Sequence, residues 1–146
     1  MAGPPLEDDR MCFCCGERNP IGLKLAFETT PEGRLNTLWR PKREHVGFKD
    51  LIHGGLVATV LDEVMARVIY ERGTPGVTAT METKLLRPVL SGREYRFSAW
   101  VVRERSRTIE TEAEAVDVET GERAAWGRAT FVRRPNETSE APASAL

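Results

Sequence analysis

Long apolar runs and a surplus of charge of either sign are both missing from this sequence of 146 residues. No run approaches the roughly 18 residues that a membrane-spanning helix needs, and no basic, apolar leader opens the chain. The 21 Lys and Arg residues nearly balance the 22 Asp and Glu residues, for a formal net charge of −1. Without a basic surplus, neither nucleic acid nor an anionic membrane is an expected partner. We therefore expect a cytoplasmic protein.

Cysteine and histidine are also scarce. The three cysteines, Cys12, Cys14 and Cys15, crowd near the N-terminus, and the two histidines are His45 and His53. An odd, adjacent set of cysteines is a poor disulfide framework and suits a reducing compartment. One C-x-x-C spacing is present, but a structural zinc would need two more ligands, and His45 and His53 are the only histidines in the chain. Half-buried free thiols are the favoured interpretation, with no metal site and no cofactor.

The apolar pattern predicts one long helix among six strands. Apolar residues recur at helical spacing from about 54 to 72, and Gly73 followed by Pro75 predicts the end of the helix. Residues 46–52 are expected to form a connecting loop. Alternating patterns predict strands at 23–27, 34–40, 77–87, 93–105, 107–118 and 123–132.

Tight turns join the later strands, so they should form an antiparallel sheet. The expected fold class is α+β, an antiparallel sheet of about five to six strands wrapped around one central helix. We expect a single domain over residues 12–134, with flexible tails at 1–11 and 135–146.

The start of the predicted helix has the composition of a reactive site. His53-Gly54-Gly55 leaves backbone N–H groups uncovered at a helix N-terminus, where the helix dipole favours negative charge. Asp62 lies two turns further along, where a carboxylate must be exposed, paired or used. A helix end that polarises a carbonyl, combined with a carboxylate, indicates acyl transfer. We expect His53 to hold the turn rather than to act as a base.

Helical geometry separates the carboxylates of Asp62 and Glu63. Glu63 precedes Arg67 by four residues, which predicts a solvated ion pair. Asp62 is either functional or held by hydrogen bonds from a neighbouring subunit. At about 100° per residue, its side of the helix carries mostly small residues and suits a groove or subunit contact. That side comprises Gly55, Ala58, Thr59, Asp62, Met65 and Ala66, whereas Leu56, Val60, Val64 and Val68 should pack on the sheet.

The spacing between Gly54 and Asp62 limits how they can act together. Eight residues correspond to about 12 Å along a helix, too far for both to reach one carbonyl group. Two antiparallel helices related by a two-fold axis would bring Gly54 of one subunit near Asp62 of the other. An active site that uses both residues should therefore lie between subunits.

These residues resemble one known family. His53-Gly54-Gly55, with Asp62 nine positions after the histidine, resembles the hotdog-fold acyl-CoA thioesterases of the PaaI-like, phenylacetate-pathway type. The resemblance extends over roughly residues 12–132. It includes His45-x-Gly47, Thr83-x-x-Leu86-x-Pro88 and the N-terminal pattern Cys12-x-x-Cys15-Gly16-x-x-Asn19-Pro20-x-Gly22-Leu23.

The resemblance implies an acyl-CoA thioesterase that works as a homodimer or homotetramer, with CoA arriving as part of the substrate. It implies that Asp62 is the nucleophile or general base, that the Gly54 N–H polarises the thioester carbonyl, and that His53 positions the loop or the substrate. The substrate-binding positions that it implies are Gly47, Gly55, Thr83 and the turn Arg105-Ser106-Arg107, which would meet the CoA phosphates.

Two positions depart from the family pattern. Some relatives carry Asn or Gln where this chain has Gly47, and some carry Ser or Thr where it has Ala66. A hydroxyl from Thr59, Thr80 or Thr83 is a possible replacement. A non-catalytic module that binds or senses acyl-CoA on the same scaffold is therefore the alternative function. A dehydratase on this fold is less favoured, because hotdog hydratases usually show a different His/Asp or His/Glu arrangement.

Overall fold

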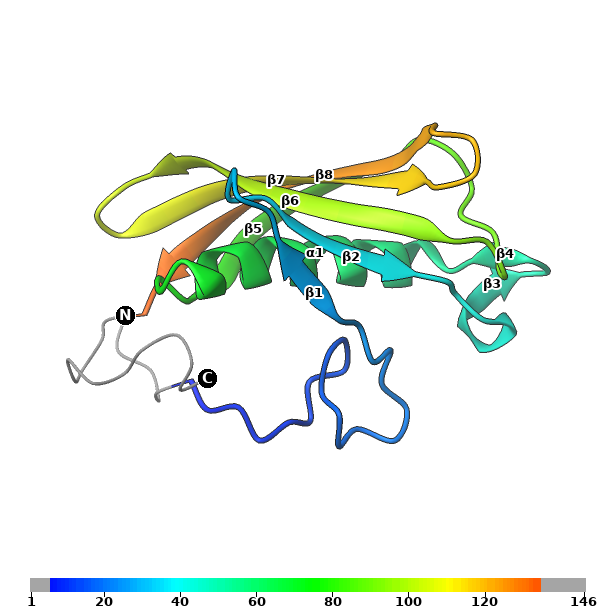
Figure 1. Cartoon of the computed structure of the whole chain (residues 1–146), viewed down its shortest axis with the longest axis horizontal. Helices are drawn as coiled ribbons and strands as arrows, with labels where there is room; N and C mark the ends of the chain where they lie inside the picture. The colour runs from blue at the N-terminus through cyan, green and yellow to red at the C-terminus, as the bar shows by residue number, and fades with distance from the viewer. Residues whose placement is uncertain (1–5, 135–146) are drawn as a thin grey trace.

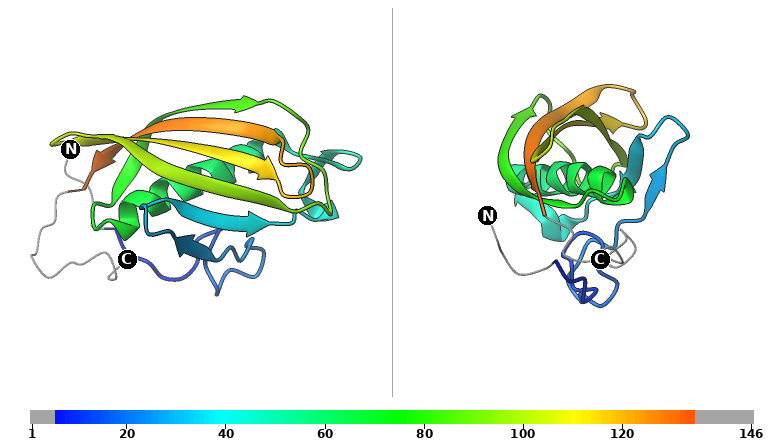
Figure 2. Two further views of the ribbon diagram at one scale, coloured as in Figure 1. Left: turned by 45° about the horizontal axis from the view of Figure 1, so that its top comes forward. Right: turned by 90° about the vertical axis from the view of Figure 1, so that its left-hand side faces the viewer.

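The computed structural model describes residues 6–134, in which a curved antiparallel sheet wraps around one helix (Figure 1, Figure 2). Helix α1 comprises Gly54–Glu71. All neighbouring strands of the main sheet are antiparallel, which confirms the predicted α+β class and six-stranded sheet. In their order across the sheet, the strands are β1 (Phe27–Thr29), β2 (Leu35–Trp39), β6 (Tyr95–Glu104), β7 (Thr108–Asp117), β8 (Arg123–Arg133) and β5 (Gly76–Leu85).

The ends of the chain are only partly described. The predicted tail at 135–146 and the first five residues of the predicted tail at 1–11 lie outside the described residues. None of the helices within residues 6–134 combines the length and apolarity that crossing a bilayer requires.

The core lies between α1 and the concave face of the sheet. Strand β7 alternates strictly, with Ile109, Thr111 and Ala113 buried and the glutamates between them turned outward. A side chain at Gly127 of β8 would place its Cβ 3.2 Å from the end of Met65, so glycine lets the helix approach closely there. The buried face of the helix comprises Val57, Val60, Leu61, Val64, Met65, Val68 and Ile69.

Two helix residues lie differently from the sequence prediction. Met65 is fully buried against the sheet rather than on the Asp62 side, and Leu56 is only partly buried. The sequence predicts a sheet-facing strip with one residue in each helical turn. A sheet that curves around a helix covers a broader arc of the helix surface than such a strip. The predicted helix end is confirmed, because Gly73 has a φ of +81° and its N–H donates to the Tyr70 carbonyl.

Two connecting segments also differ from the prediction. The strand expected at 23–27 is β1 at 27–29, because Lys24 has a φ of +57° and the Leu25 N–H donates to the Cys14 carbonyl. Within the expected loop 46–52, β3 (Val46–Phe48) and β4 (Leu51–Ile52) form a separate two-stranded sheet after the 3-10 helix η1 (Arg43–His45). This small sheet positions the start of α1.

Candidate active site

Backbone donors at the start of α1 are held in place by two histidines. The His53 Nδ1 accepts a hydrogen bond from the Gly55 N–H at 3.0 Å, as expected for a residue that holds this turn. The His53 N–H in turn donates to the His45 carbonyl at 3.0 Å. Gly54 is the first helical residue, and no group among residues 6–134 accepts a hydrogen bond from its N–H. This N–H is therefore free to bind an external oxygen.

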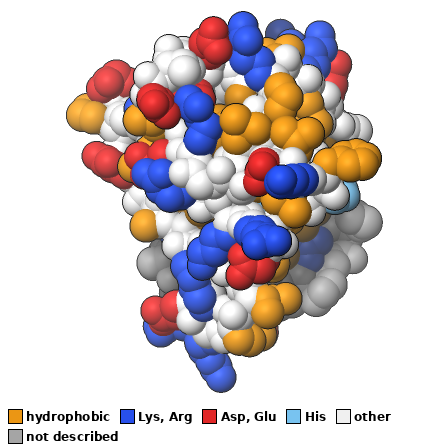
Figure 3. Space-filling view, turned by 90° about the vertical axis from the view of Figure 1, so that its right-hand side faces the viewer, with side chains coloured by type: hydrophobic (Ala, Val, Ile, Leu, Met, Phe, Trp, Pro, Cys, Tyr) orange, Lys and Arg blue, Asp and Glu red, His pale blue; other side chains and the backbone are white. Residues whose placement is uncertain are grey.

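A cavity of about 550 Å³ opens beside this turn. Three of the predicted site residues line it, namely Gly47, His53 and Gly54. Its remaining lining is mostly apolar and comes from β3, β4, the first turn of α1, the end of β5 and the segment after β5. Phe48 of β3 is 81% exposed and Leu85 is 54% exposed, so the rim offers apolar surface to a ligand. Figure 3 shows this end of the molecule, where apolar side chains lie among charged ones. The cavity suits a ligand with an acyl chain and a polar head.

Asp62 lies partly buried in the middle of α1, with one hydroxyl partner. The Thr78 hydroxyl of β5 donates to the Asp62 Oδ1 at 2.8 Å. Burial raises the pKa of Asp62 above its ordinary value, and the hydrogen bond from Thr78 opposes that rise. The result is an oriented carboxylate that is more basic than an exposed aspartate, which suits a general base or a nucleophile.

Thr78 is a site residue that the sequence did not reveal. The hydroxyl of Thr59, which the sequence offers as a replacement for the missing polar group, donates instead to the Gly55 carbonyl of its own helix at 2.8 Å. The pairing of β5 with β8 shifts by one residue between Thr78 and Thr80, as in a β-bulge. Alternation along the strand therefore breaks at that point, and the face on which Thr78 lies could not be counted from the sequence.

Edge strand β5 runs alongside α1 in the opposite direction and connects the two halves of the candidate site. Its Thr78 lies at Asp62, and the side chain of Leu85 lies against Gly54. Thr83 lies between them on the same strand, partly buried. Gly54 and Asp62 themselves remain about 12 Å apart along the helix axis. Within one subunit, they are too far apart to act on the same thioester carbonyl.

Glu63 does not form the solvated ion pair predicted for it. Arg67 pairs instead with Glu71, at 3.2 Å between the Arg67 Nε and the Glu71 Oε1. The Glu63 side chain lies partly buried against the N-terminal segment, 3.7 Å from the Cys12 Sγ. Burial raises the pKa of Glu63 to about 7. The i,i+4 rule failed because Arg67 has a second carboxylate at the same spacing on its other side.

The predicted phosphate-binding turn lies far from the helix start within one subunit. Arg105, Ser106 and Arg107 form the exposed connection between β6 and β7, at the end of the molecule where α1 terminates (Figure 1). An ion pair between Arg72, which follows α1, and Glu104 at 2.9 Å links the end of the helix to the end of β6 there. The helix of 18 residues, about 27 Å long, separates the turn from Gly54.

Comparison with known proteins supplies independent findings. The model of the thioesterase superfamily matches residues 50–124, which include α1 and the strands β5, β6 and β7. Acyl-coenzyme A thioesterase 13 from Mus musculus is 30% identical over 109 residues, which cover 73% of this chain and 78% of that protein.

Two solved structures share the fold. The thioesterase superfamily protein RHA08564 superposes with a TM-score of 0.77 at 21% identity, over 82% of this chain; the chain spans only 61% of that protein's length. The PaaI protein from the phenylacetic acid degradation operon of E. coli gives a TM-score of 0.72 at 19% identity, covering 77% of this chain and 81% of that protein.

Proposed function

This chain belongs to the thioesterase superfamily, and we propose that it hydrolyses acyl-CoA at a site shared by two subunits. The observation that carries the proposal is the separation of the two reactive groups. The free N–H of Gly54 and the oriented carboxylate of Asp62 lie on one helix, about 12 Å apart. A two-fold axis that sets two α1 helices antiparallel brings each N–H to the partner's carboxylate.

The surface along this part of the molecule supports such a pairing. Strand β5 lies at the edge of the sheet, and Thr78, Thr80 and Glu82 on it are exposed. An open edge strand of ten residues offers backbone groups to a second copy. The neighbouring helix face is also partly exposed and carries mostly small side chains, so another backbone can approach it closely. A homodimer, or a homotetramer built from two dimers, would cover both surfaces.

The proposed chemistry needs only groups of the protein and water. The thioester carbonyl oxygen accepts a hydrogen bond from the Gly54 N–H at the positive end of the helix dipole. Asp62 of the other subunit either removes a proton from the attacking water or attacks the carbonyl carbon itself. Thr78 holds the carboxylate in position. The CoA thiolate leaves and is protonated, and the free acid is released.

The distant turn fits the same arrangement. The antiparallel pairing that joins Gly54 to a partner's Asp62 also brings each subunit's helix end towards the partner's helix start. Arg105 and Arg107 then have a route to a substrate bound in the partner's cavity, where guanidinium groups suit the phosphates of CoA. Their side chains are exposed in the single subunit.

A specific observation favours the alternative, a module that binds acyl-CoA without hydrolysing it. Gly47 and Ala66 supply no polar side chain at two positions where the PaaI-like pattern that this chain resembles implies one. In that case, Asp62 would be a carboxylate held by Thr78 at a subunit interface. Calorimetry would detect acyl-CoA binding to such a protein, but a thiol assay would detect no release of CoA.

Thiol release over a panel of acyl-CoA substrates tests the proposal. The wild type should release CoA, and Asp62→Asn should lose this activity while keeping its melting temperature and its binding of acyl-CoA. Glu71→Gln, which changes an exposed carboxylate at the end of the same helix, is the matched control and should remain active. Binding without turnover by the wild type would favour the alternative, and full activity of Asp62→Asn would refute the assigned role.

A further inference from the structure

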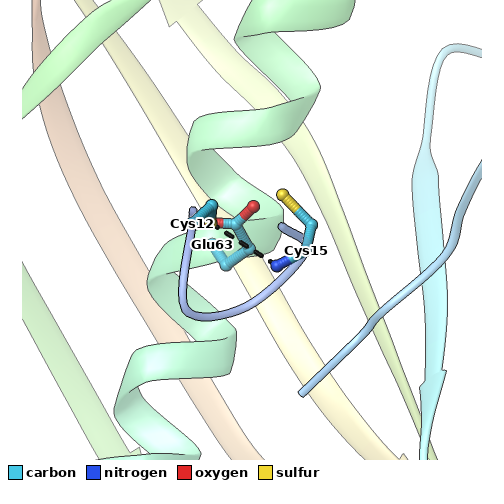
Figure 4. Close-up of side chains that lie close together, drawn as sticks. All are labelled: Cys12, Cys15 and Glu63. Carbon is cyan, nitrogen blue, oxygen red and sulfur yellow. Dashed lines mark hydrogen bonds between the residues drawn. The ribbon is translucent and has the colours of Figure 1, made fainter. Parts of the chain in front are cut away.

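The N-terminal segment carries a cluster that the proposed chemistry does not use. The Sγ atoms of Cys12 and Cys15 and a carboxylate oxygen of Glu63 all lie within 4.8 Å of one another. Figure 4 shows the loop with both cysteines lying across α1, and Glu63 projecting from the helix towards it. The three side chains are partly buried, so an ion can reach them from solvent. From this geometry, we propose that Cys12, Cys15 and Glu63 bind a zinc ion.

The loop that carries the cysteines is shaped as a tight turn around the first sulfur. The Cys15 N–H points to the Cys12 Sγ at 3.4 Å, and the Gly16 N–H donates to the Cys12 carbonyl at 2.8 Å. A Cβ at Gly16 would lie 2.4 Å from the Cys12 backbone nitrogen, so only glycine fits there. A backbone N–H directed at a sulfur stabilises its thiolate, which is the form that binds a metal.

Further hydrogen bonds connect this turn to the residues around it. The Lys24 ammonium group donates to the Glu17 carbonyl at 2.7 Å and to the Gly16 carbonyl at 3.2 Å. The Asn19 amide donates to the Met11 carbonyl at 3.0 Å. The two sulfurs therefore lie on an irregular loop whose shape is set by these hydrogen bonds. A preformed pair of thiols lowers the conformational entropy that metal binding must overcome.

The spacing of the cluster matches a tetrahedral zinc ion. Bond lengths of about 2.3 Å for Zn–S and about 2.1 Å for Zn–O place a sulfur and an oxygen ligand about 3.6 Å apart. The Cys12 Sγ and the Glu63 Oε1 are 3.7 Å apart. Two thiolates with a carboxylate are a donor set that zinc accepts, and the hard cations Mg²⁺ and Ca²⁺ prefer oxygen alone. A water molecule would complete the four ligands on the solvent side.

Zinc would also supply the cation that the Glu63 carboxylate lacks within residues 6–134, since the Cys12 thiol that donates to it at 3.7 Å is neutral. Within the part of the chain that the structure describes, Glu63 has no ion-pair partner, because Arg67 is bound to Glu71. A partly buried carboxylate without a cation is costly, and two thiolates beside it would add repulsion. A divalent cation between the three groups removes both costs. It also ties the N-terminal segment to the middle of α1, 51 residues away in sequence.

The sequence could not have supplied the third ligand. Sequence spacing offers only the two histidines beside the C-x-x-C pair, and it pairs Glu63 with Arg67. The loop and the helix meet only in the folded chain. The buried thiol of Cys14, which is 4% exposed, lies outside the group of three ligands.

Metal titration of the full chain tests the proposal without measuring hydrolysis. The protein is stripped with a chelator under reducing conditions and titrated with Co²⁺, a spectroscopic substitute for Zn²⁺, and then with Zn²⁺. We expect one equivalent to bind, with thiolate-to-cobalt charge-transfer absorption that Zn²⁺ displaces. We also expect zinc to raise the melting temperature, because it binds the folded state.

Matched variants separate the three ligands from their neighbours. Cys12→Ser, Cys15→Ser and Glu63→Gln should each lose stoichiometric Co²⁺ binding and, with it, the charge-transfer absorption. Cys14→Ala and Asp62→Asn, which change the adjacent thiol and the adjacent carboxylate, should keep both signals. Circular dichroism of each variant checks that it folds.

Three outcomes would overturn the assignment. The first is a wild type that binds neither ion while it is kept reduced, whether or not Cys12 and Cys15 form a disulfide when it is oxidised. The second is undiminished binding in a folded Glu63→Gln. The third is loss of binding in folded Cys14→Ala with retention in Cys15→Ser.

Discussion

Replacing Gly54 with proline removes the N–H group that we assign to the thioester oxygen, and it does so at a position where the helix tolerates the change. Proline is favoured at the first position of a helix, because the N–H there has no partner within the helix. The preceding residue His53 has φ −57° and ψ 127°, which is the extended conformation that a following proline requires. The variant should therefore fold.

The expected cost falls on the chemical step. Loss of one oxyanion donor typically lowers kcat by about 10²–10³-fold, or about 2.7–4 kcal/mol of transition-state stabilisation. The added Cβ has its own effect, because it would lie 2.8 Å from the Leu85 Cδ1. Gly54→Ala adds the same Cβ and keeps the N–H, and the end of a leucine side chain can move aside. The ratio of kcat between the two variants isolates the N–H group.

Steady-state thiol release at saturating acyl-CoA provides the measurement, with melting temperatures to confirm folding. We expect Gly54→Ala to lose less than about tenfold in kcat and Gly54→Pro to lose at least tenfold more than that. If both variants are folded and have equal kcat, the Gly54 N–H does not stabilise the transition state. The proposed polarisation of the carbonyl would then be wrong.

Four other changes have defined outcomes. Thr78→Val removes the hydrogen bond that holds down the pKa of Asp62, so the acid limb of the kcat/KM profile should move to higher pH; kcat/KM at its plateau should fall about tenfold, and Thr78→Ser should restore both. Gly47→Asn should raise kcat/KM about fivefold by adding an amide beside the cavity, since a Cβ there would lie 3.5 Å from the His53 ring; an unchanged rate would show that the amide does not reach the thioester. Met65→Ala should lower the free energy of unfolding by about 2–5 kcal/mol in a denaturant titration, because Met65 is fully buried. Burial lowers the pKa of His45, so the unfolded chain binds more protons and stability should fall as pH drops below 6.5; in His45→Gln that slope should be shallower, and equal slopes would contradict this.

The parts of the fold that could be predicted are those in which one local pattern decides the outcome. Strand β7 alternates residue by residue, and α1 ends where Gly73 adopts a positive φ. Both features depend on short-range periodicity and turn chemistry. The strand expected at 23–27 failed because Lys24 turns the backbone there, and its ammonium group binds carbonyls of a loop that only tertiary structure brings near.

The candidate site shows the same division. His53, Gly54 and Asp62 follow from a motif within one helix and its entry turn, and the structure places them there. Thr78 joins them across a bulge that shifts the strand by one residue. Glu63 changes partner because a loop folds over it. The partners of both residues are set by contacts between separate elements, and the periodicity of the sequence carries no information about such contacts.

The claim that the site lies between subunits is tested most directly by mixing two inactive variants. Gly54→Pro and Asp62→Asn are purified separately, combined in equal amounts and allowed to exchange subunits. Each mixed dimer then holds one intact site, formed by the Asp62 of one chain and the Gly54 of the other. With random exchange, half of the dimers are mixed, so thiol release should recover to about a quarter of the wild-type rate. If exchange is complete, as shown by a mass-tagged subunit, and the mixture stays inactive, the two groups do not act across the interface.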